Sequence, residues 1–219
     1  VLMQEITTTS MDVSLDENTL AFFCFPVYGG RIPKPMYDRM EQIKGNRTPC
    51  VLVAVYGNRA VDDALLEMQD LSDKHGFITV GGCEMIAPHS IDPTFAADRP
   101  DASDREKLVD FLKRLDEKQP LTEVKMPGNP DYKKKISDFP LYPSPSKECI
   151  GCGICYKYCP AGAISAKRMK TNIRKCISCM RCVNMCSTDS RKVPLPMRLA
   201  ARAVLKKTCS DRKEPKFYL

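Results

Sequence analysis

Several features that would place this chain in a particular class are missing from its sequence. Tryptophan is absent, and no basic stripe is interleaved with aromatic residues, so a nucleic-acid partner is not expected. No apolar run approaches the roughly 18 residues that a membrane-spanning helix needs. Residues 1–10 also lack the basic-then-apolar order of a secretory signal. The sequence therefore predicts a cytoplasmic protein, and membrane association is not expected from these features.

Length and composition are those of a globular protein with two units. The 219 residues suffice for one domain of roughly 140 residues and a smaller one. Hydrophobic residues make up 43% of the chain and charged residues 28%, which allows a packed core.

Residues 20–119 alternate short apolar runs with longer helical stretches, which indicates a parallel sheet with crossover helices. Strands are expected at 20–28, 50–56, 76–80 and 83–87, and helices at 34–44, 62–75 and 103–118. Asp62 and Asp63 are expected to cap the second helix. The thiols of Cys24, Cys50 and Cys83 are expected to be buried and structural.

Composition divides the whole chain into four segments. Residues 120–147 are rich in Pro, Gly, Lys and Ser, which is typical of a linker. The predicted segments are a first domain at 1–119, the linker at 120–147, a cysteine-rich domain at 148–190 and a basic tail at 191–219. The tail holds a candidate helix at 196–207 and a lone cysteine, Cys209, which we expect to be exposed and without function. Its basic side chains either dock on an acidic partner or an anionic membrane surface, or belong to a solvated helix packed on the cysteine-rich domain.

Eight of the twelve cysteines form two copies of one motif, C-x2-C-x2-C-x3-C. Three cysteines at this spacing can bind one [4Fe–4S] cubane, while the fourth is carried toward a second cluster. The predicted ligands are Cys149, Cys152, Cys155 and Cys186 for the first cluster, and Cys176, Cys179, Cys182 and Cys159 for the second. Zinc sites use two cysteine pairs separated by a longer loop, so zinc is the weaker alternative.

The two predicted clusters change what the charge and the cysteines imply. With their thiolates they lower the formal net charge from +7 to about +3, so the protein is only mildly basic. Cysteines at metal-ligand spacing also suit a reducing compartment better than disulfides do.

Two of the expected strands end in aromatic–glycine turns, at the edge where open parallel sheets bind ligands. The turns consist of Pro26, Val27, Tyr28, Gly29 and Gly30, and of Tyr56, Gly57, Asn58 and Arg59. Either these turns flank a flat ring, or their tyrosines and glycines simply end the strands, and the residues alone favour neither. His89 lies near the same edge, where it contacts a ligand or makes hydrogen bonds within its loop.

The stretches FPVYGGRIP, PCVLVAVYGNRAVDDALLEM and HGFITVGGCEMIAPHSI, with the two cysteine motifs, resemble the fused flavodoxin-like and ferredoxin proteins of anaerobic bacteria. The resemblance covers most of the chain. It implies an α/β flavodoxin-like parallel sheet followed by a small α+β bacterial ferredoxin-type domain with two [4Fe–4S] clusters. It also implies that the two turns contact FMN, with Tyr28 and Tyr56 against the ring and the amides of Gly57 and Asn58 at its polar rim.

The chain departs from this family at its N-terminus. Flavodoxin-like domains begin with a strand and a Ser/Thr/Gly-rich loop that wraps the FMN phosphate, and this chain has neither. We therefore expect an N-terminal truncation of about 30 residues, the length of one strand and one helix.

Three functions follow from these features, and the first is favoured. In an electron carrier, the clusters would exchange single electrons with redox partner proteins and with FMN, which accepts two electrons and releases them singly. In a flavin-dependent reductase, the clusters would feed electrons to a small-molecule substrate. In a ferredoxin with a flavin-less docking domain, the first domain would only hold a partner. Turnover of a substrate distinguishes the enzyme from the carriers, and no catalytic residue is assigned.

Overall fold

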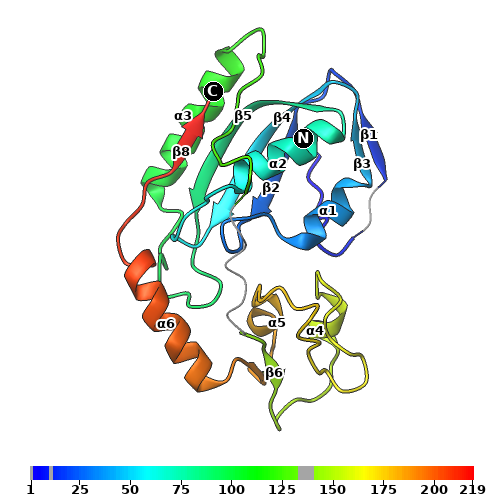
Figure 1. Cartoon of the computed structure of the whole chain (residues 1–219), viewed down its shortest axis with the longest axis vertical. Coiled ribbons are helices and arrows are strands. Elements are labelled where there is room, and N and C mark those ends of the chain that lie inside the picture. Colours follow the sequence, from blue (N-terminus) through cyan, green and yellow to red (C-terminus); the bar gives the residue numbers. More distant parts are fainter. Residues whose placement is uncertain (1, 10–11, 133–140) are drawn as a thin grey trace.

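The computed structural model describes residues 2–9, 12–132 and 141–219. Figure 1 shows an α/β part and, beyond the carboxyl ends of its strands, a small cysteine-rich module. Helix α6 (Leu195–Cys209) runs from the module back to the α/β part, where strand β8 (Lys216–Tyr218) ends the chain. Within the described ranges, no helix is both long enough and apolar enough to cross a membrane.

The main sheet has four strands in the order β2-β4-β5-β8. Strands β2 (Ala21–Pro26), β4 (Thr48–Tyr56) and β5 (Phe77–Ile86) are parallel, whereas β8 pairs antiparallel with β5. Strand β5, expected in two pieces, is continuous with one register shift against β4. The expectation of a wholly parallel sheet is therefore corrected: the sheet is mixed, because the C-terminal segment returns and adds an antiparallel edge strand.

Three helices follow the parallel strands: α1 (Lys34–Met40), α2 (Ala64–Lys74) and α3 (Ala102–Glu117). The first of them ends earlier than expected. The residues that follow it form β3 (Ile43–Gly45), which pairs in parallel with β1 (Val13–Leu15) in a separate two-stranded sheet.

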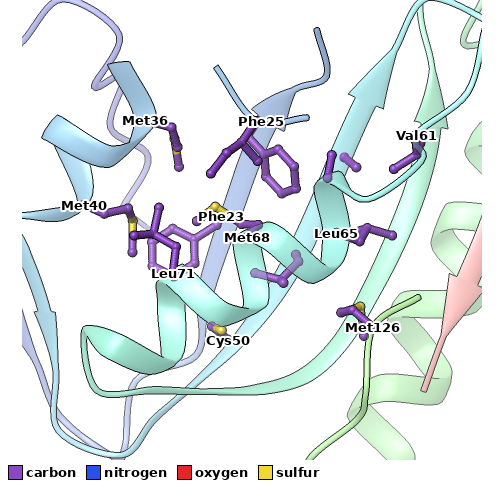
Figure 2. Packing of buried hydrophobic residues seen from close by; sticks show 14 of the residues in the cluster. Phe23, Phe25, Met36, Met40, Cys50, Val61, Leu65, Met68, Leu71 and Met126 are labelled. Atoms are coloured by element: carbon purple, nitrogen blue, oxygen red, sulfur yellow. The ribbon is translucent and has the colours of Figure 1, made fainter. Parts of the chain in front are cut away.

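The main core lies between the sheet and the helices α1 and α2. Figure 2 shows Phe23 and Phe25 of β2 on the same side as Met40 and Met68 of the two helices. Phe23 also packs edge to face on Phe77 of β5, with 4.9 Å between ring centroids. Each such buried side chain contributes about 1.5–3 kcal/mol to folding, so this layer holds the three parallel strands together.

The opposite face of the sheet is covered by α3, and Phe217 of the edge strand β8 packs in the same layer. Phe111 of α3 packs there on Val51 of β4. This layer does not reach β2, whose alternate residues point to solvent on that face. Cys24, expected to be buried, is therefore exposed, whereas Cys50 and Cys83 are buried as expected.

The cysteine-rich module is built from short elements. Its two helices are α4 (Ile154–Lys157) and α5 (Arg181–Asn184), one in each cysteine motif. Strand β6 (Ser144–Pro145) pairs antiparallel with β7 (Arg191–Lys192), which brings the two ends of the module together.

The segment expected to be a linker packs on α2 along part of its length. Met126 is buried, and its N–H donates to Oε1 of Gln69 at 2.8 Å. The side-chain amide of Gln69 in turn donates to the carbonyl of Val124 at 2.9 Å. These hydrogen bonds tie the segment to the α/β part, while the domain boundaries stay predictions.

The expected capping of α2 by two aspartates is wrong. Asp63 occupies the N-cap position, but its side chain makes no capping hydrogen bond and instead accepts from the N–H of Asn129 at 2.9 Å. Asp62 forms an ion pair with Arg59. Both carboxylates therefore hold loops at the sheet edge rather than the start of the helix.

A buried ion pair joins the start of α3 to the C-terminal segment. Arg99 donates to both carboxylate oxygens of Asp104, and the two side chains are 3% and 0% exposed. Asp104 also completes a capping box with Asp101. The guanidinium of Arg99 donates further to the carbonyl of Lys213 at 2.9 Å.

Asp104→Ala should lower the free energy of unfolding by about 3–5 kcal/mol at neutral pH, because the buried Arg99 loses the carboxylate that accepts hydrogen bonds from two of its nitrogens and keeps only the more distant Asp101 as a counter-charge, at 3.8 Å. The hydrogen bonds from Arg99 hold the pKa of Asp104 below its usual value. The stabilisation is therefore complete above the unfolded-state pKa of about 3.9 and is lost as pH falls through the lower folded-state pKa. Urea titrations at neutral and acid pH measure this. Asp110→Ala, on the exposed side of the same helix, is the control, and an equal loss in both variants would contradict the prediction.

Candidate metal centre

Each cysteine motif folds as a loop with two left-handed residues before a short helix. In the first motif these residues are Gly151 and Gly153, with φ of 69° and 78°. In the second motif the equivalent residues are Ser178 and Met180, with φ of 53° and 59°. Left-handed backbone lets the chain turn sharply between successive cysteines, and glycine adopts it without strain. The two motifs therefore repeat one backbone shape with different side chains.

Four of the predicted ligands line one cavity in the module. They come from both motifs: Cys159 from the first, and Cys176, Cys179 and Cys182 from the second. The structure thus brings together the set expected for the second cluster, and their role as ligands stays a prediction.

The surroundings of this cavity suit a cluster. The N–H of Ala163 donates to Sγ of Cys159 at 3.2 Å, the kind of contact that tunes cluster sulfurs. Burial raises the pKa of Cys179 to about 11. Burial also raises the pKa of Cys182, although a hydrogen bond from Arg191 opposes it. A thiolate here needs a neighbouring positive charge, which bound iron supplies, so the donor set fits a [4Fe–4S] cluster.

The ligands predicted for the first cluster are more open. Cys149 and Cys152 are exposed, whereas Cys155 and Cys186 are half-buried. The Sγ of Cys155 lies 3.8 Å from Sδ of Met169. Burial raises the pKa of Cys186, but hydrogen bonds from the Thr188 side chain and nearby backbone outweigh it and leave the pKa below its usual value.

The spacing of the cysteines also bears on the zinc alternative. Among residues 2–9, 12–132 and 141–219, no three Cys, His, Asp or Glu side chains gather closely enough to share a single ion. Zinc requires four ligands around one ion, whereas a cubane distributes its four cysteines over four irons and needs wider spacing.

The two turns expected to hold FMN do lie at neighbouring strand ends, since β2 pairs with β4. The polar groups of the second turn, however, are bound within the protein. The side-chain amide of Asn58 donates to the carbonyls of Cys209 and Asp211, both at 2.8 Å. The ammonium of Lys213 donates to the carbonyl of Asn58 at 2.7 Å, and Tyr56 is only 5% exposed. The C-terminal segment therefore occupies the place expected for the ring's polar rim.

The first turn lies against the cysteine-rich module. Burial raises the pKa of Tyr28 above its usual value. The charges of Cys179 and Arg181, both in the second motif, also act on this pKa, so Tyr28 lies on the side of that motif. Arg181 also pairs with Glu5 at 3.5 Å. The second turn is bound by the C-terminal segment, whereas in the first turn Pro26 is exposed and residues 27–29 are half-buried. FMN binding therefore stays a prediction of the resemblance, and no electron step is routed through it.

Two more expectations at this edge can be compared with the structure. Nδ1 of His89 accepts from the N–H of Ile91 at 3.2 Å, and its ring lies 2.7 Å from where a Cβ on Gly57 would be. His89 is thus a hydrogen-bonding loop residue in this structure. Cys209, expected to be exposed, is 1% exposed, because the face of α6 that also carries Leu205 packs inward.

Sequence reasoning missed two residues that shape this site. Met180 packs the second motif against the rest of the protein. The sequence signal for this role was the presence of methionine at the position where the first motif has Gly153. Lys213 donates a hydrogen bond to the carbonyl of Asn58 in the second turn. The sequence signal that this segment packs on the protein was the apolar end of the otherwise basic tail.

Residues 133–190 match the family model described as a 4Fe-4S dicluster domain. The match supports [4Fe–4S] binding and iron–sulfur electron transfer by this part of the chain. Searches of curated proteins and of solved structures returned no match. The flavodoxin-like part of the resemblance therefore stays a prediction.

Asn58→Gly should release the C-terminal segment, because it removes the side chain but tolerates the φ of 60° at this position. Two carbonyls lose their donor, so the free energy of unfolding should fall by about 1–3 kcal/mol. Hydrogen exchange should become faster at residues 208–218, as followed by mass spectrometry. Asn184→Gly, at an exposed position of α5, is the control. Unchanged exchange in the Asn58 variant would contradict the assignment.

Proposed function

We propose that this chain is a one-electron carrier that binds two [4Fe–4S] clusters. The ligands are those expected from the motifs, Cys149, Cys152, Cys155 and Cys186 for one cluster and Cys176, Cys179, Cys182 and Cys159 for the other. The observation that carries the proposal is the single cavity lined by the second set, which draws cysteines from both motifs. When bound, each cluster supplies a centre that accepts and releases one electron.

The remaining residues of the module hold the sites and set their surroundings. Around the second site, Ile164 and Met180 line the cavity with apolar side chains, and Ala163 donates to a cysteine sulfur. Around the first site, Cys149 and Cys152 are open to solvent. Because burial and hydrogen bonds to sulfur set cluster potentials, we expect the two clusters to differ in reduction potential.

Among the three functions considered, a two-cluster ferredoxin with a docking domain has the most support. The turn at 56–59 is bound by the C-terminal segment, and the turn at 26–30 faces the second motif. Coupling to FMN and substrate reduction stay predictions of the resemblance and enter no step of this proposal. The electrons are exchanged with redox partner proteins, in a reducing compartment such as the cytoplasm.

Anaerobic reconstitution of the full chain should load about eight irons and about eight sulfides per molecule. Cys179→Ala should remove about half of both, because it deprives one cluster of a ligand. Reduction by dithionite should produce the electron paramagnetic resonance signal of reduced [4Fe–4S] clusters. Cys24→Ala is the matched control, since Cys24 is an exposed thiol outside the motifs. Binding of zinc without sulfide, or equal iron loss in both variants, would refute the proposal.

A further inference from the structure

The two motifs share one backbone shape but are covered unequally. Residues 147–152 of the first motif are all exposed, whereas residues 176–179 of the second are half-buried. The difference comes from Met180, which packs with Leu141 and with Ala201 of α6 and is 3% exposed. The rest of the protein therefore covers the second motif.

The first motif has no such cover at the equivalent position. Gly153 stands where the second motif has Met180, and a Cβ built on it would meet nothing within 4 Å. The same holds for Gly151. Among the residues that the structure describes, the space that other elements fill around the second motif is open around the first.

A redox partner can therefore approach one cluster site more closely than the other. On the side of the second motif, Arg181 pairs with Glu5 at 3.5 Å and Met180 packs on α6, so other parts of the chain already occupy the approach. The rate of electron transfer between proteins falls steeply with the distance between the two redox centres. A partner is therefore expected to dock at the first motif, where Cys149 and Cys152 are exposed.

The surface around the first site, here called the open face, combines apolar side chains with positive charge. It consists of Lys147, Cys149, Ile150, Cys152, Tyr156 and Lys157. Ile150 is 70% exposed and Tyr156 is 50% exposed. Lys170 is exposed and adds a positive charge near the first site. Its neighbour in the sequence, Met169, contacts Cys155, which is a predicted ligand of that site.

Glu148 is the only carboxylate between positions 147 and 157, and a bound cluster with its thiolates would add about −2. A hydrogen bond from Ser146 lowers the pKa of Glu148, and the charge of the exposed Lys192 lowers it further. Lys192 therefore lies on the same side, where it helps Lys147 and Lys157 to offset this negative charge.

We propose that the open face docks an acidic one-electron-transfer protein. An apolar centre beside charged residues is the usual composition of a protein contact, and positive charge selects and steers a negative partner. The inference rests on the proposed function. With its cluster bound, the first motif would accept one electron from the partner's reduced centre. The partner is oxidised by one electron, the cluster is reduced by one, and no bond or proton changes place.

The test compares two doubly charge-reversed variants of the reconstituted full chain. Lys147→Glu/Lys157→Glu alters the open face. Arg174→Glu/Lys113→Glu is the matched control, with the same change in net charge, because Arg174 is the equivalent of Lys147 in the second motif and Lys113 is exposed on α3. The probe is an acidic flavodoxin in its hydroquinone form, mixed with each protein in a stopped-flow instrument.

The open-face variant should be reduced about tenfold more slowly than the parent at low ionic strength, and the difference should shrink in high salt. The control should stay within about twofold of the parent, as expected for an exposed site outside the contact. Equal slowing of both variants would overturn the proposal.

A second readout does not depend on the rate. Carbodiimide joins lysine amines to carboxylates of the bound probe, and we expect the cross-links at Lys147, Lys157 and Lys170. Cross-links confined to Lys206 and Lys207 of α6 would place docking on the helix and overturn the proposal. Failure of the proposed function itself is distinguishable, because the parent chain would then contain no iron and sulfide and dithionite would reduce nothing.

Discussion

The return of the C-terminal segment to the α/β part is the constraint on which the rest of the arrangement depends. From residue 141 the chain forms the cysteine-rich module, and it comes back through α6 to add β8 to the sheet. Asn58 donates to the carbonyl of Cys209 and accepts from the ammonium of Lys213, and the buried guanidinium of Arg99 binds the same segment. A module held at both ends loses most of its freedom to rotate, so one of its two motifs is kept against the sheet edge.

This restraint makes two equivalent motifs inequivalent. A free two-cluster module would expose both sites similarly, because its motifs repeat the same left-handed turns. Here Met180 is buried against α6, while Gly153 at the matching position faces open space. Hydration, hydrogen bonding and access to a partner all differ as a consequence, and these are the quantities that set the potential and the exchange rate of a cluster.

The same restraint decides what happens at the carboxyl ends of the parallel strands. In open α/β sheets this edge usually receives a small ligand. In this chain protein groups occupy part of it: the carbonyls of Cys209 and Asp211, at and just after the end of α6, accept from the side-chain amide of Asn58. The turn that holds Tyr28 is itself anchored, since Arg31 donates to both oxygens of the buried Glu67 at 2.6 Å. An edge suited to ligand binding thus serves as a contact between two parts of one chain.

Local pattern was enough to predict the longer elements of the α/β part and the iron–sulfur chemistry. Cysteine spacing predicted the module, an unbroken apolar run predicted β4, and periodic apolar residues predicted α2 and α3 close to their observed ends. The exposure of Cys24, the burial of Cys209 and the strand β8 came only from tertiary structure. The physical reason is separation along the chain. Asn58 and Cys209 are 151 positions apart, and a hydrogen bond between them leaves no periodicity in either neighbourhood. A short pattern records which face of an element is apolar, but it does not record which distant segment covers that face.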